Sequence, residues 1–306
     1  ALGEGAASVG VPNQVEQRKG DVATALPSSL TTAATFDPAI AHAGGVMIGS
    51  EARAKRFNVL LAGGVNLTRD PWNGRNFEYL GEDPLLAGLM AGEHIRGVQE
   101  NDIVSTVKHF ALNSQETGRM IVDARIGEAD LRESDLLAFQ IAIERGDPGS
   151  VMCAYNKVNG DWACENDFLL NHVLKGDWGY DGWVMSDWGG VHSTEKAALA
   201  GLDQQSGQEL DKALYFDAPF AEALAAGRIS EDRLDDMVRR YLVGLIDNGV
   251  LDAPVVETPQ PIDYAAHAEV AQRAAEQGIV LLKNERDVLP LAATATRTAV
   301  IGGHAD

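Results

Sequence analysis

The stretch Trp183-Val184-Met185-Ser186-Asp187-Trp188 joins a short apolar run, typical of a buried strand, to a carboxylate and an aromatic ring. Three more apolar runs have the same form. They span residues 57–61, 103–107 and 150–154, and they lead to Arg69-Asp70, Lys108-His109 and Tyr155-Asn156. Because the carboxyl ends of parallel strands meet at one edge, we expect these polar side chains to converge.

Helical patterns separate the four predicted strands. Asp37-Pro38 and Asp83-Pro84 each combine an N-cap with a proline in the first turn, and they predict helices toward Arg56 and Gln99. Further helices are expected at 129–145, 167–175 and 231–247. This alternation predicts a mainly parallel α/β sheet, either a (β/α) barrel or an open doubly wound sheet.

A second unit is predicted after residue 251. Residues 252–261 contain three prolines and are typical of a linker. A helix at 264–277, a strand at 279–282 and a further strand and turn at 299–303 follow. Two strands cannot bury their own faces, so we expect this unit to be completed beyond Asp306 or by another chain.

Composition excludes several classes of protein. The 306 residues carry a formal charge of −20, which disfavours nucleic acid and anionic lipid as partners. The chain lacks the run of about eighteen apolar residues that a membrane span needs, and it shows no export signal at Ala1. A start without Met fits a processed exported protein or a cut chain. We expect a periplasmic or secreted location, with the cytoplasm left open.

Cys153 and Cys164 are too few for a zinc cluster, and we expect no metal and no cofactor. Asn159-Gly160 lies between them and is a hairpin-turn signal. The hairpin could bring the two thiols together; a pair of inert buried thiols is the alternative. A dinucleotide cofactor is disfavoured because Gly44-Gly45 and Gly49 lie within a helical pattern.

Cleaving a glycosidic bond requires a carboxylate that attacks or stabilises the anomeric carbon and an acid that protonates the leaving oxygen. Asp187 at a strand end suits the first role, and Trp188 offers a face for sugar stacking. Lys108 and His109 could bind sugar hydroxyls. The residues alone leave three alternatives open: a capping role for Asp187, a Schiff-base role for Lys108, and a non-catalytic sugar-binding module.

Longer motifs make a family resemblance specific. They are Asn66-Leu67-Thr68-Arg69-Asp70-Pro71, Gly74-Arg75-Asn76-Phe77-Glu78-Tyr79-Leu80-Gly81-Glu82-Asp83-Pro84, Val107-Lys108-His109-Phe110-Ala111-Leu112-Asn113, Val151-Met152-Cys153-Ala154-Tyr155-Asn156 and Gly182-Trp183-Val184-Met185-Ser186-Asp187-Trp188-Gly189. In this order the chain resembles family 3 glycoside hydrolases of the two-domain β-glucosidase type. The resemblance implies a (β/α) TIM-like barrel at 1–251, a linker at 252–262, and the first part of an α/β sandwich domain at 263–306.

The resemblance also implies an exo-acting, retaining hydrolase of oligosaccharides or β-glycosides, with Asp187 as nucleophile. The implied lining of the terminal-sugar subsite is Arg69, Lys108, His109, Met152, Tyr155 and Trp188. The acid/base is implied to be a Glu beyond Asp306, in the remainder of the second domain. Arg75, Glu78 and Asp83 are interpreted as structural, forming an ion pair and a helix cap.

Two positions depart from the family pattern. Ala6 stands where relatives carry an Asp that binds distal hydroxyls, so that contact would be missing or supplied by Glu4. Trp183 replaces a smaller apolar residue, which indicates local repacking. A β-xylosidase or another exo-β-glycosidase therefore stays open as an alternative, and so does a homodimer.

Overall fold

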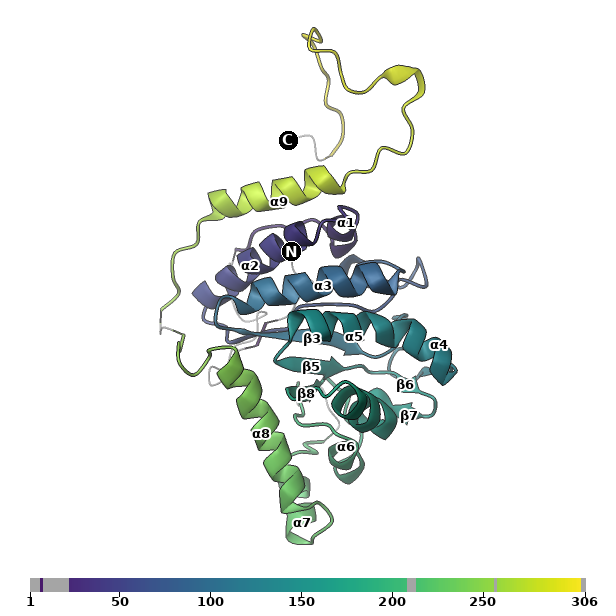
Figure 1. Cartoon of the computed structure of the whole chain (residues 1–306), viewed down its shortest axis with the longest axis vertical. Helices are drawn as coiled ribbons and strands as arrows, with labels where there is room; N and C mark the ends of the chain where they lie inside the picture. Colours follow the sequence, from purple (N-terminus) through teal and green to yellow (C-terminus); the bar gives the residue numbers. More distant parts are fainter. Residues whose placement is uncertain (1–5, 8–21, 208–212, 256–257, 304–306) are drawn as a thin grey trace.

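A five-stranded, mainly parallel sheet organises the fold (Figure 1). The computed structural model describes residues 6–7, 22–207, 213–255 and 258–303. The strands are β1 (Ala6–Ala7), β2 (Val59–Leu60), β3 (Val104–Phe110), β5 (Ser150–Cys153) and β8 (Trp183–Ser186), side by side in that order. β2, β3, β5 and β8 pair in parallel, and β1 is antiparallel to β2. The four predicted strands and the α/β class are confirmed.

Helices α2 (Pro38–Ala54) and α3 (Pro84–Gln99) begin where the sequence predicts. The Asp37 carboxylate accepts from Ala39 N and the Asp83 carboxylate from Leu86 N, so both residues are N-caps. The two helices pack closely through glycine. A Cβ on Gly45 would lie 2.1 Å from the His94 carbonyl oxygen, a contact that only glycine allows.

The helix predicted at 129–145 is wrong in one respect, because it is broken at Ser134. It forms α4 (Glu128–Glu133) and α5 (Asp135–Gly146), and Ser134 between them has φ −121° and ψ −94°. The break places Asp135 at the start of α5, where its buried carboxylate accepts from Arg69. The hydrophobic periodicity of the sequence does not encode this contact between Asp135 and Arg69, which are distant in the chain.

The remaining elements cover or extend this frame. They are α1 (Ser29–Ala33), η2 (Asn76–Glu78), η3 (Ala163–Glu165), the π-helix η4 (Phe168–Asp177), α6 (Glu195–Leu199), α7 (Ala218–Ala225), α8 (Glu231–Asp247), α9 (Tyr264–Gly278), η5 (Glu285–Asp287) and a small sheet of β4 (Asp123–Ala124), β6 (Lys157–Val158) and β7 (Asp161–Trp162). Figure 1 shows α2, α3 and α5 stacked over one side of the main sheet.

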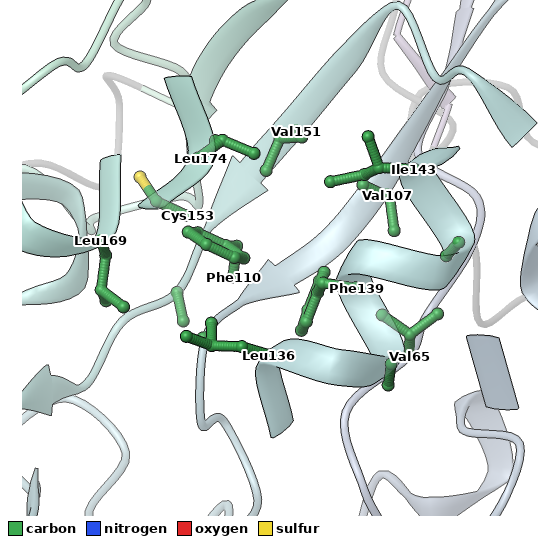
Figure 2. Close-up of a cluster of buried hydrophobic side chains, with 14 of the residues drawn as sticks. Val65, Val107, Phe110, Leu136, Phe139, Ile143, Val151, Cys153, Leu169 and Leu174 are labelled. Atoms are coloured by element: carbon green, nitrogen blue, oxygen red, sulfur yellow. The ribbon is translucent and has the colours of Figure 1, made fainter. Parts of the chain in front are cut away.

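The main core lies between the sheet and these helices. Figure 2 shows Phe110 of β3 and Phe139 of α5 in this core; their ring centroids are 5.1 Å apart. Trp183 packs in a second cluster against Tyr241 of α8, at 4.9 Å. A Cβ on Gly244 would lie 2.5 Å from the Trp183 ring, so this glycine makes room for the larger side chain. Trp183 is thus accommodated in a packed cluster, and the repacking relative to the family stays a prediction.

The two cysteines form a disulfide. Between them, β6 and β7 make an antiparallel hairpin, and Asn159 (φ 51°) and Gly160 (φ 109°) form its turn. The Cα atoms of Cys153 and Cys164 lie 5.2 Å apart. Of the two alternatives, the structure has the bridged pair.

The segment after residue 251 is partly as predicted. Helix α9 forms and packs against α1 and α2. The strands predicted at 279–282 and 299–303 are wrong: both segments lack strand pairing, and Leu282 and Ile301 are each 91% exposed. A strand requires a neighbouring edge, and none of the described strands lies beside them. The proposed domain boundaries stay a prediction. No helix within the described ranges is long and apolar enough for a membrane span.

Candidate active site

Asp187 lies directly after β8, with a side chain that is almost fully buried. Its backbone N–H donates to the Cys153 carbonyl at 3.2 Å, and the Trp188 N–H donates to Oδ1 at 2.8 Å. Among the described residues, Oδ2 has no hydrogen-bond partner. Burial raises the pKa of the Asp187 carboxyl, although the nearby Tyr155 hydroxyl, the Trp188 N–H and the charges of Arg75 and Lys108 act in the opposite direction. The carboxylate is thus held by a hydrogen bond at Oδ1, whereas Oδ2 is buried without a hydrogen-bond partner among the described residues.

His109 lies at the end of β3 and faces this carboxylate. Its Nε2 is 3.0 Å from an Arg75 guanidinium nitrogen and 3.7 Å from Asp187 Oδ2. Burial, then the charges of Arg75, Lys108 and Arg119, lower the pKa of His109 well below its usual value. The imidazole is therefore neutral at pH 7 and accepts from Arg75 through Nε2. His109 and Asp187 do not form an ion pair.

Arg75, Glu78 and Lys108 form a buried charged group beside Asp187. Arg75 donates two hydrogen bonds to the Glu78 carboxylate, at 2.8 and 3.0 Å, and Lys108 Nζ lies 3.4 Å from the same carboxylate. Burial opposes the charge of Arg75, but the bonds to Glu78 outweigh it and raise the pKa of the guanidinium. The structural interpretation of Arg75 is therefore incomplete, because its charge acts on both His109 and Asp187.

Tyr155 and Arg119 form another side of the site. The Arg119 guanidinium carbon lies 4.4 Å from the Tyr155 ring centroid, and Arg119 also donates to Glu116 at 2.7 Å. Burial and the Asp187 carboxylate raise the pKa of the Tyr155 hydroxyl, which keeps it protonated as a donor. Met152 belongs to a buried apolar cluster against which half-buried Trp188 packs.

The structure brings together Asp187, Lys108, His109 and Tyr155, with Trp188 and Met152 adjacent, but it does not bring Arg69 to them. The Arg69 guanidinium donates to the Asp135 carboxylate at 2.5 Å and to Ser134 at 3.1 Å, and its side chain is 47% exposed. The attraction of buried Asp135 explains this placement. Ala6 pairs with Leu60 in the sheet, and Glu4 lies outside the described residues.

Sequence reasoning missed Arg119 and the part that Arg75 plays in the site. Arg75 carried a signal, because it lies three residues before Glu78 within a family motif, but i,i+3 spacing also fits an ordinary surface ion pair. Arg119 lies in the loop after β3. A loop has no hydrophobic periodicity, so the sequence does not indicate where its side chains lie. Within the described ranges, no group of His, Cys, Asp or Glu could hold a metal ion.

Comparison with known proteins defines the class of this fold and site. Residues 9–243 match the model of the glycosyl hydrolase family 3 N-terminal domain. Among curated proteins, the chain is 41% identical over 277 residues to beta-glucosidase B of Emericella nidulans, covering 89% of this chain and 32% of that protein. It is 40% identical over 283 residues to thermostable beta-glucosidase B of Acetivibrio thermocellus, covering 92% of this chain and 36% of that protein. The chain thus spans about a third of the length of these relatives.

Comparison with solved structures leads to the same class of protein. Beta-glucosidase 3B from Thermotoga neapolitana, in complex with glycerol, has a TM-score of 0.83 at 38% identity, over 90% of this chain and 39% of that one. DesR, a beta-glucosidase from Streptomyces venezuelae in complex with D-glucose, has a TM-score of 0.84 at 38% identity, over 89% of this chain and 36% of that one. The fold is an α/β TIM-like domain of a glycoside hydrolase. The chain belongs to glycosyl hydrolase family 3.

Proposed function

We propose that this chain carries the nucleophile of an exo-acting, retaining β-glucosidase. One observation carries the proposal: Asp187 ends a core strand as a buried carboxylate, with Oδ1 held by a backbone N–H and Oδ2 without a hydrogen-bond partner among the described residues. Such a carboxylate can attack an anomeric carbon through Oδ2. The attack forms a glycosyl–aspartate ester as the aglycone oxygen departs, and water later cleaves that ester.

The surrounding charges support this chemistry. Positive charge develops on the sugar ring in the transition state, and the ionised Asp187 stabilises it. Neutral His109 keeps a further positive charge away from that ring. Arg75 and Lys108 are cations, and both are partly neutralised by Glu78. Guanidinium and ammonium groups beside a carboxylate of this kind are suited to binding sugar hydroxyls.

Glucose is the proposed sugar because the curated relatives are named beta-glucosidases and a solved relative is described in complex with D-glucose. We also propose an exported location, which the Cys153–Cys164 disulfide supports, since disulfides persist mainly in oxidising compartments. Comparing initial rates on aryl β-glucoside and aryl β-xyloside tests the sugar. Faster cleavage of the xyloside would contradict the glucose assignment.

Nucleophile rescue tests the mechanism. Asp187→Gly should lower turnover of 2,4-dinitrophenyl β-glucoside by at least about a hundredfold. Azide should then occupy the space of the missing carboxylate and give α-glucosyl azide, with the anomeric centre inverted. A β-configured azide, or Asp187→Gly activity near that of the wild type, would contradict the role of Asp187.

A further inference from the structure

A buried carboxylate behind the candidate site has no part in the chemistry described above. Glu165 ends η3, and it is 4% exposed. Its Oε1 accepts from the His192 backbone N–H at 3.1 Å and from the Ser193 hydroxyl at 2.8 Å. Both donors belong to the loop 188–193, which follows Asp187. Glu165 therefore binds the far end of the loop that begins at the proposed nucleophile.

The near end of this loop is also fixed. The Asp187 N–H donates to the Cys153 carbonyl, and the Gly190 N–H donates to the Asp187 carbonyl at 3.0 Å. Cys153 is bridged to Cys164, the residue before Glu165. One covalently linked unit thus holds both ends of the loop.

The middle of the loop is packed against the same unit. A Cβ on Gly190 would lie 3.4 Å from the Cys164 sulfur, so the loop backbone rests on the bridge. The His192 ring stacks on Trp162 of β7, with centroids 4.0 Å apart and planes at 22°. Ala163 N–H donates to the Asn156 carbonyl at 2.9 Å, which ties η3 to the segment that carries Tyr155.

We propose that Glu165 is a positioning residue, which sets the orientation of the Asp187 carboxylate and the Trp188 ring through the loop 188–193. The proposal rests on the function proposed above. A reacting carboxylate has to lie within about half an ångström of its productive place, and displacement by about 1 Å costs about a hundredfold in rate. Glu165 itself does not contact the sugar in this account.

The test measures how fast 2,4-dinitrophenyl 2-deoxy-2-fluoro-β-glucoside labels Asp187, since its leaving group departs without an acid. Glu165→Ala should lower the labelling rate constant by about 10- to 100-fold. Glu165→Gln keeps an oxygen acceptor and should stay within about threefold of the wild type. The Kd of glucose should change by a smaller factor than the labelling rate in both variants, because Lys108, His109 and Tyr155 lie on other elements and only the Trp188 face moves with the loop.

Ser193→Ala removes one of the two hydrogen bonds and provides a milder variant. It should lower the labelling rate by less than Glu165→Ala does, and the double variant should be no slower than Glu165→Ala alone, because both changes act through one contact. Circular dichroism and thermal melting check that each variant is folded at the assay temperature. If Glu165→Ala cannot fold, the labelling rates of Ser193→Ala and Glu165→Gln still test the positioning role. A slower Ser193→Ala supports it, and a Ser193→Ala that is labelled at the wild-type rate contradicts it.

Labelling of a folded Glu165→Ala protein at the wild-type rate would overturn the proposal. So would equal losses in Glu165→Gln and Glu165→Ala, or strictly additive losses for Glu165→Ala and Ser193→Ala. If the wild-type protein itself is not labelled at Asp187, the proposed function fails and this inference fails with it. The two failures are therefore distinguishable.

Discussion

Two arginines close in sequence have different roles. Arg75 donates to Glu78 and contacts His109, whereas Arg69 contacts Asp135 and Ser134. A residue's motif membership therefore does not fix where its side chain points. The buried carboxylate within reach of each guanidinium decides that.

The two arginines provide a matched pair of variants. Arg75→Ala should lower kcat/KM on aryl β-glucosides by about 10²- to 10³-fold, since it removes a charged donor and leaves Glu78 partly unpaired. Arg69→Ala should lower the free energy of unfolding by about 1–3 kcal/mol while leaving kcat/KM nearly unchanged. Steady-state kinetics and urea unfolding measure the two effects. A large loss of kcat/KM in Arg69→Ala, with its free energy of unfolding unchanged, would place Arg69 in the sugar subsite instead.

The raised pKa of Asp187 has a consequence for stability. Burial makes the native state hold the Asp187 proton to higher pH than the unfolded chain does, so this group's contribution to stability falls as pH rises through that window. Asp187→Asn removes the buried charge. Its Tm should therefore exceed that of the wild type at pH 7, and the difference should shrink as pH falls below about 4, the unfolded value. A lower Tm for Asp187→Asn at pH 7 would contradict this electrostatic account.

At the scale of elements, helix α2 contains a test of glycine packing. Gly44 and Gly45 are neighbours, yet a Cβ on Gly44 would meet nothing within 4 Å, whereas one on Gly45 would lie 2.1 Å from the His94 carbonyl oxygen. Gly44→Ala should stabilise the protein by about 0.5–1 kcal/mol through helix propensity. Gly45→Ala should destabilise it by about 1–3 kcal/mol, because α3 has to move. Denaturant unfolding of both variants measures this, and equal effects would show that the helices are not packed this closely.

Elements with strong local signals were predictable from the sequence. Asp37 and Asp83 mark the starts of α2 and α3, and α8 has the bounds expected of it. The Asn159-Gly160 turn correctly located the hairpin that brings the cysteines together. The break at Ser134 was not predictable, because the helical pattern continues through it and the Asp135 contact with Arg69 is long-range. The alternation of predicted strands and helices placed Asp187, Lys108, His109 and Tyr155 at strand ends. Arg119 lies in a loop that has no hydrophobic periodicity to locate it.

At the scale of the whole molecule, the site in this chain has one carboxylate in the attacking position and needs a second. Glu78 is bound by Arg75 and Lys108, and Glu116 by Arg119. Both carboxylates are thus already engaged by cationic side chains of the chain itself. We propose that the acid/base Glu comes from sequence beyond Asp306. The lengths of the curated relatives, of which this chain spans about a third, are consistent with that.

Residues 1–306 alone should therefore be catalytically incomplete. The fragment should fail on cellobiose, whose leaving group needs a proton, yet react slowly with 2,4-dinitrophenyl β-glucoside. Azide should accelerate release of the sugar, since it attacks without a general base. Glucose release and dinitrophenol absorbance report the two reactions. Full activity of the purified fragment on cellobiose would place the acid/base within these residues.

The identity of the residue that bonds to the sugar is the central claim of this account, and one measurement tests it most directly. The protein is incubated with 2,4-dinitrophenyl 2-deoxy-2-fluoro-β-glucoside, digested, and analysed by tandem mass spectrometry. We expect one added fluoroglucosyl group per chain, on Asp187, and none in Asp187→Asn. A stable label on another carboxylate, or on Lys108, would contradict the account.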